Sequence, residues 1–103
     1  MRCEFYLPGC KALFRRYAAQ EQQLRTAIEQ HIDGQIATDF VHTKLASRRL
    51  FNGLKVYECR VNVGKLPALR VAFTVRTGVA TVVYISTNIQ KSEFSKEIDA
   101  FLK

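Results

Sequence analysis

The sequence lacks several features that would place it in a familiar class. No apolar run approaches the ~18 residues that cross a membrane, and the N-terminal stretch lacks the layout of a signal peptide. The cysteines are odd in number, Cys3, Cys10 and Cys59, and none are in a CxxC motif. We therefore expect a cytoplasmic protein with no membrane contact, whose thiols are reduced and packed rather than bonded to each other or to zinc.

Common catalytic motifs are also absent. There is no Gly-rich phosphate loop and no HExxH sequence. Nothing brings His31 and His42 together as a paired-histidine ribonuclease would need. His31 falls near the apolar stripe of a predicted helix, which favours a packed or capping role, and His42 lies in a segment that the pattern does not assign. Clustered carboxylates that could hold a catalytic metal are lacking, so we predict no metal and no cofactor.

Acidic residues are nearly missing from residues 40–92. Nine basic residues and a single acid, Glu58, give this half a net charge of +8, whereas the remainder of the chain carries −1. A solubility-driven surface would mix the two signs. A one-sided positive field suits a polyanion such as RNA, DNA or an acidic protein segment, although solvated surface charge is the simpler reading.

Residues 54–87 hold three alternating stretches, at 54–63, 68–76 and 80–87. Their apolar side chains share one face, and Glu58, Arg60, Arg70 and Arg76 share the other. Turn sequences separate them, at 64–67 and at Thr77-Gly78, and predict two antiparallel hairpin connections. The prediction is a sheet with one apolar face and one face bearing arginines.

The N-terminal part predicts a short strand over Arg2–Leu7, stopped by Pro8-Gly9, and then helical spacing to Ile32. We expect a break near residues 19–21 that folds the helical segment into a hairpin, and a helix end at Gly34. Residues 35–52 leave room for a loop and a short strand. Ser92 is expected to cap a helix ending at Leu102, whose apolar stripe includes Phe94.

These elements predict a single domain over residues 1–103. Its fold class is α+β, an antiparallel sheet of about four strands with an N-terminal helical hairpin packed on one face and a C-terminal helix. In this arrangement we expect the helices to share one face of the sheet.

One phosphoester chemistry suits such a chain. RNA supplies its own nucleophile, the 2′-hydroxyl, so a protein can accelerate cleavage by positioning the strand and neutralising charge. The guanidinium fork of arginine matches phosphate oxygens, and Arg60 and Arg70 fall on the same face of neighbouring strands. Glu58, two residues from Arg60, either acts as a base or pairs with an arginine.

The chain resembles the RelE/ParE superfamily of bacterial toxins, especially its RelE- and HigB-like branches. The similarity is carried by the opening strand and helical hairpin, by KLASRRLFNGLKVYECRV entering the sheet, by the ALRVAFTVRTGVATVVYIS hairpin and by the basic stretch before the last helix. The resemblance implies the toxin of a type II toxin–antitoxin system, an mRNA interferase that cuts mRNA on the ribosome. It also implies an antitoxin protein partner and a toxin–antitoxin hetero-oligomer.

By position, Arg60 matches a basic residue of the family's main hairpin, Arg70 its phosphate-binding arginine, and Lys91 its C-terminal basic position. With Glu58 these are the candidate catalytic residues. Two positions depart from the family pattern, because Glu58 stands where RelE has a lysine and Phe94 falls near a tyrosine. The candidate RNA-binding residues share a positive charge in the basic half: Lys44, Arg48, Lys55, Lys65 and Arg76.

Two alternatives remain open. ParE-like members are expected to share the fold but to inhibit DNA gyrase without cutting nucleic acid. A non-catalytic module that binds RNA or a protein partner would fit the same charge distribution.

Overall fold

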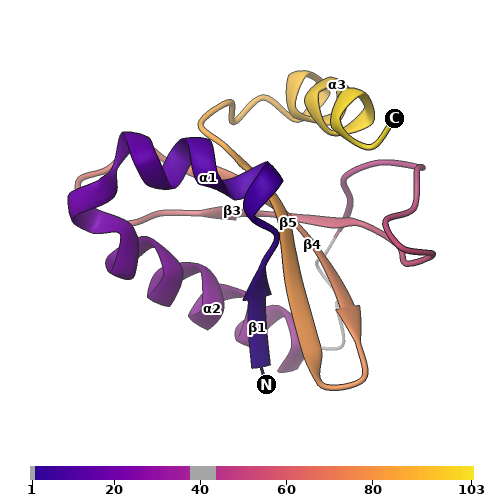
Figure 1. Cartoon of the computed structure of the whole chain (residues 1–103), viewed down its shortest axis with the longest axis horizontal. Coiled ribbons are helices and arrows are strands. Elements are labelled where there is room, and N and C mark those ends of the chain that lie inside the picture. Colours follow the sequence, from indigo (N-terminus) through magenta and orange to yellow (C-terminus); the bar gives the residue numbers. More distant parts are fainter. Residues whose placement is uncertain (1, 38–43) are drawn as a thin grey trace.

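The computed structural model describes residues 2–37 and 44–103 and centres on a five-stranded sheet in the order β1-β5-β4-β3-β2 (Figure 1). The strands are β1 (Arg2–Phe5), β2 (Lys44–Leu45), β3 (Tyr57–Val61), β4 (Leu69–Arg76) and β5 (Val79–Ser86). The helices are α1 (Leu7–Arg16), a 3-10 turn at Ala18–Gln20, α2 (Glu21–Ala37) and α3 (Lys91–Phe101). The α+β class is therefore confirmed.

The sheet is mixed rather than antiparallel, which corrects the prediction of about four antiparallel strands. β1 pairs parallel with β5, with Arg2 opposite Val79, while the other neighbours pair antiparallel. A parallel pair needs a long crossover between its strands, and the chain between β1 and β5 contains all of the other strands. No local turn sequence indicates a parallel pairing between strands so far apart in the chain.

The hairpins lie where the turn sequences predict them. β3 and β4 are joined through residues 62–68, and β4 and β5 through Thr77-Gly78. Both turn residues have positive φ, 26° at Thr77 and 76° at Gly78, as a tight hairpin turn requires. The first main strand is shorter than predicted, because the chain before Tyr57 makes a separate turn bridged between Phe51 and Leu54.

The helical hairpin breaks at residues 17–20, close to the predicted position. Pro8 does not stop a strand but lies in the first turn of α1, where its missing N–H is not needed. The prediction that a helix ends at Gly34 is wrong, since α2 continues through Gly34 to Ala37. Ser92 is not the cap of the last helix either, because α3 starts at Lys91 behind Gln90.

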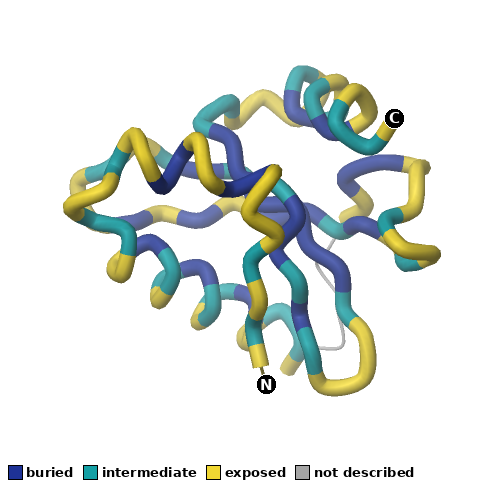
Figure 2. The backbone as a smooth tube through the Cα atoms, viewed as in Figure 1, coloured by how far each residue is buried: buried dark blue, intermediate teal, exposed yellow. Residues whose placement is uncertain are grey.

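Both faces of the sheet are covered, which corrects the expectation that all helices share one face. α1 and α2 pack on the face that carries Val71 and Phe73. α3 packs Phe94 and Ile98 on the opposite face, against Ala72. Figures 1 and 2 show α3 apart from the helical hairpin, with buried stretches along the strands between them. The centre of the supposed arginine face is therefore a second, smaller core.

The helix α1 lies directly on the backbone of β5. A Cβ added at Gly9 would overlap the carbonyl oxygen of Val83, so only glycine permits this approach. The register between β4 and β5 shifts at Ala72/Phe73, and Val83 is the residue left over on β5.

The cysteines pack as free thiols, with Cys10 and Cys59 buried and Cys3 half-buried. Within the described ranges, no helix has the length and apolar character needed to cross a bilayer.

Candidate functional site

A pocket of about 230 Å³ collects side chains from α2, β2, β3, β4 and the start of α3. It brings together the four residues predicted to be catalytic, Glu58, Arg60, Arg70 and Lys91. The full lining adds a predicted RNA-binding lysine and three residues that were not predicted: Lys44, His31, Gln35 and Cys59. The pocket is strongly basic, with four cationic side chains around a single carboxylate.

The sheet register sets the spacing of these groups. Arg60 on β3 lies directly opposite Arg70 on β4, and Lys44 on β2 lies directly opposite Glu58. Glu58 and Arg60 are two residues apart and so share a face. Direct cross-strand partners have Cβ atoms ~5 Å apart, and like charges in such a pair repel each other. An anion between Arg60 and Arg70 would relieve this repulsion.

Arg70 is held from two sides. Its Nε donates a hydrogen bond of 2.6 Å to the carbonyl oxygen of Ile89, in the segment that leads into α3. Its Nη1 lies 3.4 Å from Oε1 of Glu58 on β3. Arg70 therefore ties the start of α3 to the sheet, and this fixes the place where Lys91 enters the pocket.

Glu58 is a buried carboxylate, with a side chain only 3% exposed. Burial raises its pKa above the ordinary value, and the positive charges of Arg70, Lys91 and Lys44 oppose part of that rise. Its Oε2 atom is buried and has no hydrogen-bond partner among the described residues. A buried acceptor in this state costs free energy, and a hydroxyl or N–H of a ligand would satisfy it.

His31 lines the pocket, although the sequence pattern favoured a packed or capping role for it. Its ring is half-buried, and burial lowers its pKa, so the imidazole is neutral at neutral pH. The face of α2 that packs toward β3 carries it to the pocket. No signal in the sequence marks this, because helical spacing does not say which strand a helix covers. His42 lies outside the described residues.

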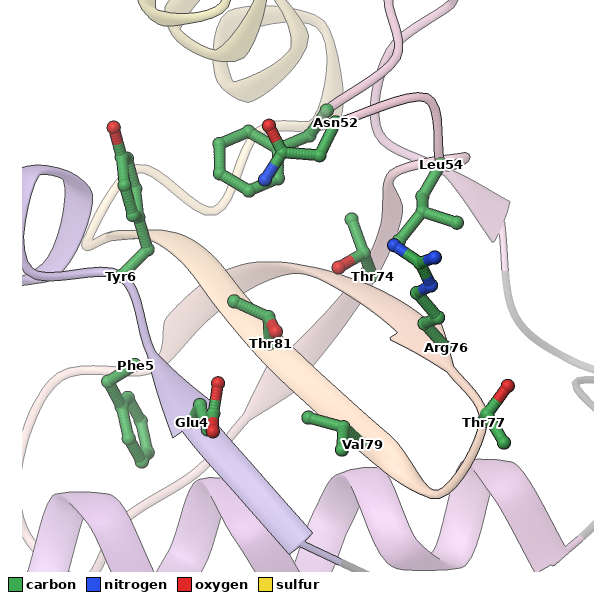
Figure 3. Close-up of a pocket in the computed structure, with 11 residues that line it drawn as sticks. Glu4, Phe5, Tyr6, Asn52, Leu54, Thr74, Arg76, Thr77, Val79 and Thr81 are labelled. Atoms are coloured by element: carbon green, nitrogen blue, oxygen red, sulfur yellow. The ribbon is translucent and has the colours of Figure 1, made fainter.

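The other predicted RNA-binding residues do not join this pocket. Lys55 and Lys65 are exposed in the segments before and after β3, and Arg48 lines a different pocket beside α3. Arg76 ends β4 and lines a pocket with Glu4 (Figure 3). It is six residues from Arg70, or about 20 Å along a strand. Phe94 is fully buried on the side of α3 that faces the sheet, and it does not line the pocket either.

Within residues 2–37 and 44–103, no three His, Cys, Asp or Glu side chains lie close enough together to hold a metal ion. The pocket's own side chains can supply positive charge and proton transfer. Comparison with known proteins found no matching protein-family model, curated protein or solved structure.

Proposed function

We propose that this protein is a cytoplasmic toxin of a type II toxin–antitoxin system, a metal-independent endoribonuclease that cuts mRNA on the ribosome. The observation that carries the proposal is the basic pocket, in which Arg60, Arg70, Lys44 and Lys91 surround the buried carboxylate of Glu58. The resemblance to the RelE/ParE superfamily supports it. The order of strand, helical hairpin, antiparallel hairpins and terminal helix agrees with what that resemblance implies.

The reaction would use the 2′-hydroxyl of the RNA as its nucleophile. The 2′-oxygen attacks the adjacent phosphorus, and the bond to the 5′-oxygen of the next nucleotide breaks. The products are a 2′,3′-cyclic phosphate and a free 5′-hydroxyl. The proton of the 2′-hydroxyl passes to a base, and the leaving 5′-oxygen takes a proton from an acid. No metal is needed if cationic side chains neutralise the charge that develops on the phosphate.

Each pocket group suits one of these tasks. Arg60 and Arg70 face each other across two strands and would grip the non-bridging phosphate oxygens. Glu58 would take the proton of the 2′-hydroxyl, because its raised pKa makes it a stronger base than an ordinary carboxylate. The ammonium groups of Lys91 and Lys44 are the nearby proton donors for the leaving oxygen.

His31 is a second group able to accept a proton, because its lowered pKa keeps the imidazole neutral. Separate Glu58→Gln and His31→Gln variants distinguish the two groups. If Glu58 is the base, Glu58→Gln removes the rise of the cleavage rate with pH, whereas His31→Gln retains it.

The proposed nucleic-acid partner follows from the charge, and the proposed antitoxin follows from the resemblance to the RelE/ParE superfamily. Residues 40–92 carry a net +8, which suits mRNA in the ribosome, itself rich in phosphate. The neutralising antitoxin would be a separate protein that forms a hetero-oligomer with this chain and blocks access to the pocket.

The test is induced expression in a bacterial host with mapped mRNA ends. Wild type should arrest growth and leave 2′,3′-cyclic phosphate ends, and Arg60→Ala should lower cleavage by ~100-fold or more. Arg60 is exposed, so its loss should change stability by no more than ~0.5 kcal/mol. Arg15→Ala, which removes an exposed arginine from α1, is the matched control and should cut like wild type.

Full cleavage by Arg60→Ala would refute the assignment of this pocket. Intact mRNA together with gyrase-dependent DNA breaks would instead favour the ParE-like alternative. Salt-sensitive RNA binding without cleavage or growth arrest would favour the non-catalytic module.

A further inference from the structure

A second pocket, of about 540 Å³, lies at the other end of the sheet from the basic pocket (Figure 3). Its floor is formed by β1, β5 and β4, on the face that also carries α3. Its wall is the turn between Phe51 and Leu54. This volume falls in the range of small-ligand sites, and nothing in the proposed cleavage reaction uses it.

The floor is a polar grid set by the sheet register. Glu4, Thr81 and Thr74 are direct partners in one row across the three strands. Val79 and Arg76 belong to the next row. Figure 3 shows the hydroxyl groups of Thr74 and Thr81 between the Glu4 carboxylate and the Arg76 guanidinium.

The two charges of the pocket stand at opposite ends. Glu4 and Arg76 are separated by two strand spacings, or about 10 Å, plus an offset along the strands. The Arg76 guanidinium is exposed, and no ion pair or hydrogen bond joins it to another described residue. Glu4 pairs with Arg2 at 2.9 Å, but Arg2 is 74% exposed, and an exposed pair of this kind is readily exchanged for a ligand.

The wall is aromatic. The rings of Tyr6 and Phe51 meet edge to face with centroids 4.9 Å apart, and Tyr6 is 38% exposed. Asn52 adds an amide to the lining of the same pocket (Figure 3). Its φ of 51° and the 77° of Gly53 form the tight turn that carries this amide to the rim. A flat ring system could rest against this wall.

We propose that this pocket binds a guanosine 5′-phosphate group. The base would rest on Tyr6 and Phe51, where the Glu4 carboxylate accepts the two adjacent N–H groups of the guanine edge. Adenine lacks that pair of donors. The 5′-phosphate would reach Arg76, with the threonine hydroxyls between, because the separation of the two charges is close to the reach of a mononucleotide. The inference rests on this pocket's own lining and does not require cleavage at the basic pocket.

The ligand could be a free guanine nucleotide or a guanosine within an RNA strand. Calorimetric titration with guanosine 5′-monophosphate, adenosine 5′-monophosphate and unphosphorylated guanosine tests the shared chemistry. Wild type should prefer the guanine nucleotide, and Glu4→Gln should reduce that preference by about tenfold. Arg76→Ala should weaken the binding of guanosine 5′-monophosphate by about tenfold and leave the binding of guanosine unchanged. Arg15→Ala should change neither.

A four-nucleotide RNA with a single guanosine distinguishes the two sources. Tighter binding than the mononucleotide identifies a strand, and binding of the mononucleotide alone identifies a free nucleotide. Equal affinity for the two mononucleotides overturns the proposal, and so does an Arg76→Ala variant that binds like wild type. Loss of nucleotide binding in Arg60→Ala would also overturn it, because the phosphate would then sit in the basic pocket. Cleavage assays on Arg60→Ala report on the proposed function independently.

Discussion

Replacing Arg70 by alanine should destabilise the fold as well as impair the proposed chemistry, because Arg70 holds two elements together. The variant loses the 2.6 Å hydrogen bond from Nε to the Ile89 carbonyl. A hydrogen bond from a charged donor contributes about 1.5–3 kcal/mol. The Arg70→Ala variant also leaves Glu58 without its ion-pair partner, and such a loss costs up to ~3–5 kcal/mol when a pair is fully buried.

The cost of leaving Glu58 unpaired is smaller than this upper value, because the pair is neither fully buried nor closely spaced. Arg70 is 19% exposed, and the contact with Glu58 is long, at 3.4 Å. We therefore expect a loss of about 3 kcal/mol in the free energy of unfolding at neutral pH. Arg70→Ala thus mixes structural and chemical effects, and Arg60→Ala is the cleaner probe of the pocket.

The loss should depend on pH with a definite sign. Burial raises the folded-state pKa of Glu58 above its unfolded value, and removing Arg70 takes away a charge that lowers it. The folded variant then binds a proton more readily than the unfolded chain, so its stability falls as pH rises from the ordinary glutamate pKa through the raised one. The deficit should be largest at neutral pH and shrink under mildly acidic conditions.

Urea unfolding followed by circular dichroism, at neutral and mildly acidic pH, measures this. Glu58→Gln removes the buried charge but keeps an acceptor for Arg70, so it should change stability by less than about 1 kcal/mol. The double variant should recover about 1–2 kcal/mol relative to the sum of the single changes. Additive effects, or a deficit that is the same at both pH values, would refute this account of the pair.

Two further predictions concern packing and the thiols. Gly9→Ala should lower the free energy of unfolding by about 1–3 kcal/mol, since the new Cβ would overlap the Val83 carbonyl oxygen. Gly34→Ala is the control, because Gly34 lies in the last turn of α2 with open space around it, and it should raise the free energy of unfolding by about 0.5–1 kcal/mol. If urea unfolding showed Gly9→Ala to be the more stable of the two variants, the contact between Gly9 and Val83 would be contradicted. Burial raises the pKa of Cys10 and of Cys59 to about 12, and that of Cys3 to about 11, with nearby acids adding to the rise at Cys3. Native protein should therefore resist a thiol-reactive chromophore at neutral pH and react at all three thiols once unfolded; rapid native labelling would contradict their packing.

A large part of the candidate site could be predicted from local sequence patterns. Period-two alternation put Arg60 and Arg70 on one face, and the structure confirms that they are cross-strand partners in the same pocket. The break in the helical hairpin was likewise readable, because the apolar stripe is interrupted by the polar residues 20–23.

Other features could not be read, because they depend on which elements meet. The same alternation put Arg76 on the face of Arg70, but six residues of extended strand carry it to a different pocket. Helical spacing placed His31 near the apolar stripe of its helix, but it could not indicate that residues of β3 would line the same pocket. The prediction that all helices share one face of the sheet failed, because α3 packs onto Ala72 on the other face.

Short-range periodicity and charge order therefore decided which side chains share a face and where the positive charge lies, since both depend only on neighbours along the chain. Tertiary structure alone decided the parallel pairing of β1 with β5 and the burial of Glu58 beside Arg70. It also decided the entry of His31 and Lys91 into one pocket. The physical reason is that these contacts join residues from separate elements, and their free energy comes from packing and desolvation that exist only once the elements have met.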